Sequence, residues 1–278
     1  LIKTFGGLLT SSIIISQTEE VNAESEVFYL DRGKNKQEKG DHAGAISDFT
    51  KAIKINPNNE INYIDRGLSK DDLGNYQDAI DDFTKAIKLN PKNPYAYGFR
   101  GHSKSALKNY EGAISDFTKA IEINPEQKYI GEMYYNRGLS KGNLKDYQGA
   151  ISDFTKAIEV DIKNYYLPYA YYSRGLLKVN LKDYKGALSD FTKAIELNPK
   201  YQEAFYNRGI TRGKLDKHQD AIIDLTKAIE LNPKDSEAFF KRGLSKSSLN
   251  DKEGAISDFV KVIKLNPRHP EVFTARGL

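Results

Sequence analysis

The sequence contains no cysteine among its 278 residues. This absence excludes disulfide bonds, thiolate zinc sites, thiol nucleophiles and lipid anchors attached through sulfur. Histidine is scarce as well. The four histidines, His42, His102, His218 and His269, lie far apart and lack the spacing of metal ligands. We therefore expect neither a metal nor a cofactor.

Charge of one sign is not concentrated anywhere. Lysine and arginine number 42 against 38 acidic residues, and the two signs are interspersed along the chain. A basic stripe or arm of the kind that coats nucleic acid phosphates is missing, so we expect no nucleic acid partner. RNA read along a helical-repeat groove stays an alternative, which strong and salt-sensitive binding to RNA would favour.

A long hydrophobic run is also missing. The apolar run from Phe5 to Ile15 follows Lys3 and is too short to span a bilayer, so we expect no stable membrane span. Val21-Asn22-Ala23 has the small-residue pattern of a signal-peptidase site, which predicts a signal peptide over residues 1–23. With that signal the protein is exported to a periplasm, a lumen or the extracellular space. Without it, we expect a cytoplasmic protein in which this segment is a stub of a longer chain.

The sequence consists largely of one repeated unit. Two dipeptides recur at a spacing of 34 residues, which widens to 37 on each side of the fourth unit. Asn-Pro starts at residues 56, 90, 124, 198, 232 and 266, and Arg-Gly at residues 32, 66, 100, 137, 174, 208, 242 and 276. Self-similarity at a fixed period is typical of repeat architectures. We assign a repeat array to residues 24–278, with units at about 26–59, 60–93, 94–127, 131–164, 168–201, 202–235 and 236–269 and the start of an eighth at 270–278.

Within one unit the apolar residues have helical spacing. From Tyr110 onward they follow steps of three and four, which predicts an amphipathic helix that Pro125 ends. A first helix precedes it, and the short polar turn Lys108-Asn109 between the two requires that they lie antiparallel. Glycine inside a helix costs about 1 kcal/mol relative to alanine, so Gly101 in the first helix and the small Ala113 in the second indicate a close helix approach.

The pattern Tyr97-x2-Arg100-Gly101, followed by Ala113-x3-Phe117-x2-Ala120 and Pro125, resembles the tetratricopeptide repeat, whose period is 34 residues. The resemblance covers residues 26–278. It implies an all-α fold, a right-handed superhelical solenoid of antiparallel helix pairs, with first helices lining a concave groove and second helices forming the outer surface. One helix pair cannot bury its apolar face alone, so neighbouring pairs must stack.

The chain departs from the family pattern in its charges. Where the family usually carries leucine and tyrosine on the first helix, this chain has arginine and lysine, as at Arg137 and Lys141. Every second helix also carries an aspartate, as at Asp153. We predict a ladder of Arg–Asp pairs within or between helix pairs. The alternative is a row of cations that binds anions, which the matching row of aspartates disfavours.

The repeat phase places an aromatic residue beside a second, mostly hydrogen-bonding residue on the first helices of the fourth to seventh units. The predicted partner-binding groove consists of Tyr135, Asn136, Tyr172, Ser173, Tyr206, Asn207, Phe240 and Lys241. Such a row suits an extended peptide, because rings supply contact area at low entropic cost and amides can hold a peptide backbone. The other interpretation is that these rings only pack against the next helix pair.

Two three-residue insertions flank the fourth unit and bring apolar residues to positions where a polar linker is expected. These residues are Tyr129, Ile130, Tyr165, Tyr166 and Leu167. Exposed apolar clusters can mark a contact surface, so self-association through these residues is one hypothesis. Coverage of the ends of the longer helices is the other.

The sequence shows no catalytic constellation. No nucleophile has a base beside it, and no glycine-rich phosphate loop occurs. We expect a non-enzymatic scaffold or adaptor that binds a protein or an extended peptide in the concave groove. The alternative is the substrate-recruiting arm of an enzyme whose catalytic domain lies outside this sequence. Because Leu278 falls within the eighth unit and no polar cap follows, we expect the natural chain to continue.

Overall fold

The computed structural model describes residues 25–125, 129–160 and 166–272. These residues form fourteen helices and no strand. The chain divides into two compact units, residues 1–127 and residues 128–278. Each unit is built from consecutive helix pairs, and we describe the two units separately.

The first unit holds three helix pairs. They are α2 (Glu26–Glu38) with α3 (His42–Ile55), α4 (Glu60–Asp72) with α5 (Tyr76–Leu89), and α6 (Pro94–Ala106) with α7 (Tyr110–Ile123). The second unit holds four pairs. They are α8 (Ile130–Asn143) with α9 (Tyr147–Glu159), α10 (Leu167–Asn180) with α11 (Tyr184–Leu197), α12 (Gln202–Gly213) with α13 (His218–Leu231), and α14 (Ser236–Ser248) with α15 (Lys252–Leu265).

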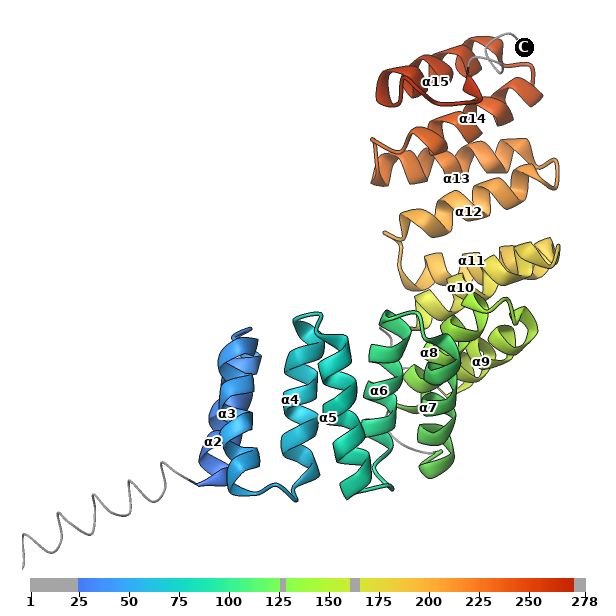
Figure 1. The fold of residues 1–278 in the computed structure, drawn as a ribbon. Helices are drawn as coiled ribbons and strands as arrows, with labels where there is room; N and C mark the ends of the chain where they lie inside the picture. Colours follow the sequence, from blue (N-terminus) through green and yellow to red (C-terminus); the bar gives the residue numbers. More distant parts are fainter. Residues whose placement is uncertain (1–24, 126–128, 161–165, 273–278) are drawn as a thin grey trace, which may run out of the picture. The chain divides into compact units, whose positions relative to one another are not determined.

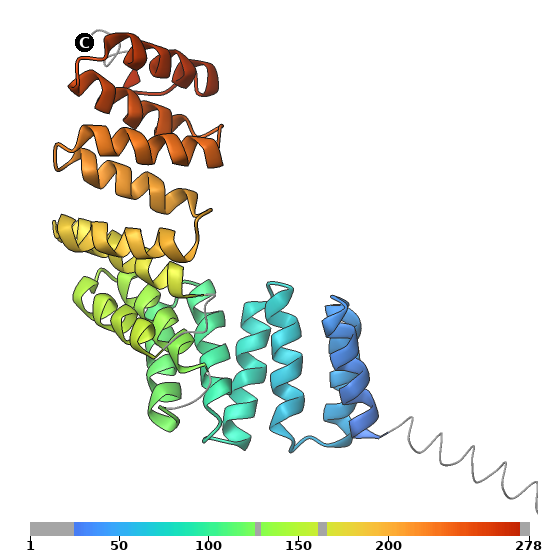
Figure 2. The same ribbon diagram turned by 180° about the vertical axis from the view of Figure 1, so that it is seen from behind.

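The helices of one pair lie side by side, and within each unit every pair packs on the next along the chain (Figure 1; Figure 2). The predicted all-α solenoid of antiparallel helix pairs is therefore confirmed. The predicted helix end before Pro125 and the turn at Lys108-Asn109 are confirmed as well, since α7 ends at Ile123 and α6 at Ala106.

Every turn inside a helix pair contains one residue with a positive φ. In the first two pairs this residue is glycine, at Gly40 and Gly74. In the other five pairs it is Lys108, Lys145, Lys182, Asp216 or Asn250, with φ from 56° to 64°. The residue that follows caps the second helix in most pairs: Asp146, for example, accepts a hydrogen bond of 3.0 Å from the backbone nitrogen of Gly149. This local chemistry holds the turns short and polar.

The recurring glycine of Arg-Gly lies against the side chain of a bulky apolar residue on the second helix of its own pair. A Cβ added to Gly101 would come within 3.0 Å of Cε1 of Phe117, and one added to Gly138 within 2.9 Å of Cε1 of Phe154. A close approach at Gly101 is present as predicted, and the atoms nearest to an added Cβ belong to the ring of Phe117. Ala113 is itself buried, at 0% exposure.

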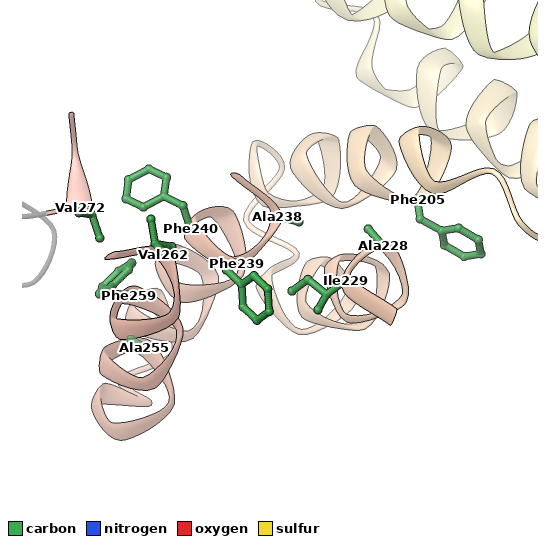
Figure 3. Close-up of a cluster of buried hydrophobic side chains, with 10 residues drawn as sticks. All are labelled: Phe205, Ala228, Ile229, Ala238, Phe239, Phe240, Ala255, Phe259, Val262 and Val272. Atoms are coloured by element: carbon green, nitrogen blue, oxygen red, sulfur yellow. The ribbon is translucent and has the colours of Figure 1, made fainter. Parts of the chain in front are cut away.

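A continuous apolar core runs through the last pairs of the second unit. Figure 3 shows Phe240, Phe259, Val262 and Val272 gathered together, and Val272 belongs to the start of the eighth unit.

Residues 1–23, where a signal peptide is predicted, lie outside the described residues. No helix in the described part of the chain combines the length and the apolar character needed to cross a bilayer.

Candidate functional site

The first helices of the second unit form one face of the molecule. Within this unit, the Cα atoms of α8 and α10, of α10 and α12, and of α12 and α14 come within 8 Å of one another, while successive second helices approach less closely. The first helices therefore lie on the inner side of the stack. We call the eight predicted groove residues on these helices the inner row: Tyr135, Asn136, Tyr172, Ser173, Tyr206, Asn207, Phe240 and Lys241.

The tyrosine rings of the inner row are half-buried and pack between helix pairs. The ring of Tyr135 lies 5.7 Å from that of Phe154 in its own pair and 5.7 Å from that of Tyr166 in the next pair. The ring of Tyr172 lies 5.9 Å from Phe191 and 4.8 Å from Tyr201 in the same two directions. These rings thus serve the packing between pairs while one edge stays accessible.

Two polar residues of the inner row hydrogen-bond to tyrosine hydroxyls of the preceding pair. Asn207 donates a hydrogen bond of 3.0 Å to the hydroxyl of Tyr172, and the Ser173 side chain hydrogen-bonds to the hydroxyl of Tyr135. Asn207 also donates to the backbone oxygen of Glu203 at 2.9 Å. These bonds link α8 to α10 and α10 to α12.

Burial raises the pKa of the tyrosine hydroxyls on the inner row. It raises the pKa of Tyr172 to about 12, with a further contribution from the charge of Glu203. Burial also raises the pKa of Tyr206 to about 12, followed by the charges of Glu237 and Asp235. The pKa of Tyr135 is raised by burial as well. Around neutral pH these hydroxyls, like tyrosine hydroxyls in general, are neutral and can donate and accept hydrogen bonds.

Phe240 does not line the groove as predicted. Its side chain is 1% exposed, because its ring lies between Phe259, at 5.9 Å, and the ring of His269, at 4.5 Å. Phe240 consequently belongs to the core shown in Figure 3 and cannot contact a partner. Lys241 beside it is half-buried, with its ammonium 4.9 Å from the ring of Phe240 and 4.0 Å from the carboxylate of Glu237.

The predicted Arg–Asp ladder is present in all seven helix pairs. Arg137 donates from Nε and Nη2 to the two carboxylate oxygens of Asp153, at 2.9 and 2.7 Å. The other pairs with this two-bond geometry are Arg32–Asp48, Arg66–Asp82, Arg100–Asp116, Arg174–Asp190, Arg208–Asp224 and Arg242–Asp258. A second cation one turn later completes each site, as Lys141 does at 2.8 Å from Asp153.

The ladder also connects successive helix pairs within each unit. Arg208 donates from Nη1 to the hydroxyl oxygen of Thr192 in the preceding pair, at 3.1 Å. The same link joins Arg66 to Thr50, Arg100 to Thr84, Arg174 to Thr155 and Arg242 to Thr226. Because each of these guanidinium groups is bound to a carboxylate and a threonine, the ladder is structural, and the alternative of an anion-binding row is not supported.

The residues proposed for self-association do not form one exposed cluster. Tyr129 is 43% exposed, but Ile130 is buried at 7%, which corrects its assignment to a contact surface. Tyr166 packs on Tyr135, and its hydroxyl lies 3.4 Å from a carboxylate oxygen of Glu132. Leu167 is half-buried, and Tyr165 lies outside the described residues.

One pocket was not predicted from the sequence. It lies between α12, α13 and α14 and has a volume of about 300 Å³. Ile210 and Leu244 belong to its walls, Leu225 to its floor, and Lys241 of the inner row to its rim. The available signal was Leu225 itself, because the other six second helices carry phenylalanine at this position.

The described residues hold no group of three or more histidine, aspartate or glutamate side chains that could bind a metal ion.

Two models described as tetratricopeptide repeat match the chain. One matches residues 63–93, 168–201 and 203–235, and the other matches residues 28–59, 94–127, 131–164 and 236–269. These segments make up most of the sequence. No curated protein sequence matches the chain.

Solved structures of similar proteins agree with these matches. YrrB, described as a TPR protein with an unusual peptide-binding site, is 26% identical with a TM-score of 0.63, over 70% of this chain and 98% of that chain. MamA is 29% identical with a TM-score of 0.56, over 64% of this chain and 94% of that chain. A tetratricopeptide repeat protein from Parabacteroides merdae is 23% identical with a TM-score of 0.63, over 91% of this chain and 97% of that chain, which shows the fold alone.

Proposed function

The chain belongs to the tetratricopeptide repeat family, and on this premise we propose that the inner row of its second unit holds an extended segment of a partner protein. The family is generally a non-catalytic scaffold for protein–protein interaction, and the repeats of this chain are of that kind. The finer proposal concerns which surface binds and how. Phe240 is left out of it because the ring is buried.

The observation that carries the proposal is the alignment of tyrosine and polar side chains on successive first helices. Tyr135, Tyr172 and Tyr206 are half-buried, so their rings are already ordered before a partner arrives. Ordered rings offer contact area at a low entropic cost, and neutral hydroxyls can hydrogen-bond to the backbone of an extended segment. Asn136 and Asn207 add amide groups to the same face.

The likeness to YrrB supports a peptide as the occupant. That protein is described as having a peptide-binding site, and 98% of its chain aligns with 70% of this one at 26% identity. A solenoid presents a repeated set of side chains along its inner face, which suits a linear ligand better than a compact one. We therefore propose a linear segment of a protein, bound along α8, α10 and α12.

A capture experiment with matched variants tests the proposal. The bait is the full chain, and the proteins it retains from an extract of its source cells are identified by mass spectrometry. The test variant carries Tyr135→Ala, Tyr172→Ala and Asn207→Ala. A second variant, with Asn136→Lys, Ser173→Lys and Asn207→Lys, keeps the packed rings and places charge on the inner row instead.

The control variant carries Lys156→Ala, Lys193→Ala and Lys227→Ala, three exposed lysines on the second helices. We expect a partner that the parent and the control retain and that both inner-row variants lose, with thermal melts showing that all four chains are folded. Retention of the same partner by the inner-row variants would place the binding surface elsewhere and contradict the proposal.

A further inference from the structure

The pocket between α12, α13 and α14 owes its existence to two residues of the sixth helix pair. The side chain of Leu225 lies against Gly209, where a Cβ added to the glycine would be 2.9 Å from Cγ of Leu225. In the other six pairs a phenylalanine ring lies against the corresponding glycine. A leucine fills less of this space than a ring. Gly213, one turn later on α12, adds no side chain over the opening, and a Cβ there would meet its nearest atom at 3.8 Å.

The interior of the pocket is apolar. Ile210 and Leu244 contribute aliphatic surface, and Leu225, which is 1% exposed, lies beneath them. The volume of about 300 Å³ is at the lower end of the range of about 300–1,000 Å³ for small-ligand sites. This size accommodates one bulky apolar side chain.

The rim of the pocket is basic. Lys214, His218 and Lys241 line it, and no carboxylate does. The nearest acidic partners are weakly placed: the Lys241 ammonium is 4.0 Å from Glu237, and Nε2 of His218 is 3.8 Å from Asp216, whose side chain is 95% exposed. Nδ1 of His218 is buried and has no hydrogen-bonding partner in the described part of the chain.

The pocket continues the inner row. On α12, Tyr206, Ile210 and Gly213 are spaced by four and three residues and therefore share one face of the helix. On α14, Lys241, Leu244 and Ser248 do the same. A linear segment that lies along the inner row would therefore pass over the opening of the pocket.

We propose that this pocket takes one bulky apolar side chain from an acidic segment of the partner protein. The inference rests on the proposed function and adds the chemistry of the ligand. The apolar floor recognises the side chain, and the basic rim recognises carboxylates on either side of it, which favours an acidic over a basic segment. The sixth helix pair thereby fixes the register of the bound segment.

Fluorescence anisotropy with labelled peptides and the full chain tests this inference. The probe is Gly-Glu-Glu-Phe-Glu-Glu-Gly, compared with a peptide carrying alanine for phenylalanine and with one carrying lysine for glutamate. We expect the alanine and the lysine peptides each to bind about ten-fold or more weakly than the probe. Equal binding of the alanine peptide would overturn the apolar pocket, and equal binding of the lysine peptide would overturn its preference for an acidic segment. Absence of probe binding at millimolar concentration would overturn the inference as a whole.

Leu225→Phe is the decisive variant. It restores the ring that the other six pairs carry, so it should fold, and it fills the pocket from below. We expect it to weaken binding of the probe about ten-fold or more, while Ile223→Phe, a ring added to the same helix at a 59% exposed position, leaves binding unchanged. Unchanged binding by Leu225→Phe would overturn the inference.

The charged rim has its own test. Lys214→Gln combined with Lys241→Gln should weaken probe binding at low salt, and the difference from the parent should shrink as salt is raised. Parent-like affinity at low salt would overturn the role of the rim. The capture experiment distinguishes this inference from the proposed function. If Leu225→Phe still retains a partner that the Tyr172→Ala and Asn207→Ala changes release, the proposed function stands and the pocket inference is wrong.

Discussion

Glycine in the Arg-Gly dipeptide is required by volume and not by backbone angle. Within α8, a methyl group on Gly138 would lie 2.9 Å from the ring of Phe154, whereas one on Gly142, four residues later, would meet its nearest atom at 4.0 Å. The two glycines share a helix and face different surroundings, although Gly142 lies nearer the end of the helix at Asn143. They form a matched pair for measuring the cost of the contact.

We expect Gly138→Ala to lower the free energy of unfolding by about 1–3 kcal/mol, because the ring of Phe154 must move. Gly142→Ala should raise it by up to about 1 kcal/mol, because alanine favours the helix. Denaturant unfolding of the two variants and the parent provides the comparison. Equal stability of Gly138→Ala and the parent would show that Phe154 does not constrain this position.

The tyrosines of the inner row make the free energy of unfolding depend on pH in the alkaline range. Burial raises the pKa of Tyr172 and of Tyr206 to about 12 from the ordinary value of 10. The folded form therefore keeps these protons while the unfolded form loses them, so the stabilisation is fully present below pH 10 and is lost as pH rises toward 12. Tyr172→Phe should lose less stability across this window than the parent, as followed by urea unfolding. Identical pH profiles would contradict the shift.

The sequence predicts which helix carries a residue better than it predicts whether the side chain of that residue is exposed. The repeat phase placed Tyr135 and Tyr172 on the first helices, and the structure brings them into packing contact with the next pair. Whether a ring is covered depends on the residue that the connection after its own helix pair supplies. That residue is His269 above Phe240, and its place over the ring depends on how the connection after α15 folds back, which periodicity does not reveal.

The Arg–Asp pair is the main polar contact between the two helices of one pair. Asp153 is 3% exposed and Arg137 15%, so both charges are largely removed from water. Their hydrogen bonds compensate for that removal only while both partners are present. At the first pair, where Arg32 binds Asp48, these hydrogen bonds hold the pKa of the aspartate at about 2.

We expect Asp153→Ala to lower the free energy of unfolding by roughly 3–5 kcal/mol, because it leaves Arg137 and Lys141 without their carboxylate. Removal of the exposed Lys156, 2.9 Å from Glu159, should leave the free energy of unfolding close to that of the parent, because an exposed ion pair is screened by water. Thermal and denaturant unfolding of both variants tests this. A melting temperature of Asp153→Ala equal to that of the parent would show that the ladder contributes nothing.

Helices and turns were predictable because their causes are local. The polar turn at Lys108-Asn109 and the stop before Pro125 follow from neighbouring residues alone, and the structure ends α6 and begins α7 there. The pocket was not predictable, although Leu225 stands out among six phenylalanines. Its volume depends also on the separation of α12 and α14, which arises from the packing of whole helices.

At the scale of the whole unit, the threonine links make neighbouring pairs cooperative. Arg208 bridges Asp224 of its own pair and Thr192 of the preceding one, so a change at this point acts on two pairs. In a solenoid, stability is the sum of the contributions of single units and of the contacts between neighbours. The threonine hydrogen bond is one of the contacts between neighbours.

We expect Thr192→Val, which keeps the shape of the side chain, to lower the free energy of unfolding by about 1–2 kcal/mol and to broaden the unfolding transition. Ser189→Ala, at an exposed position on the same helix, should change neither quantity. Denaturant unfolding followed by circular dichroism measures both quantities. An unchanged transition width in Thr192→Val would indicate that helix packing alone couples the pairs.

The uniformity of the ladder has a consequence for folding kinetics. The helices α9 and α11 share the run Ser-Asp-Phe-Thr-Lys-Ala-Ile-Glu, so Arg137 and Gly138 of α8 match Asp190 and Phe191 as well as their own partners. The mispairing closes a loop of 53 residues between Arg137 and Asp190, instead of 16 between Arg137 and Asp153, and the longer loop costs about 1 kcal/mol more. Mispaired intermediates of nearly equal energy should therefore form early, and their rearrangement, or the exchange of helices between chains at high concentration, would limit the rate at which this protein reaches its native state.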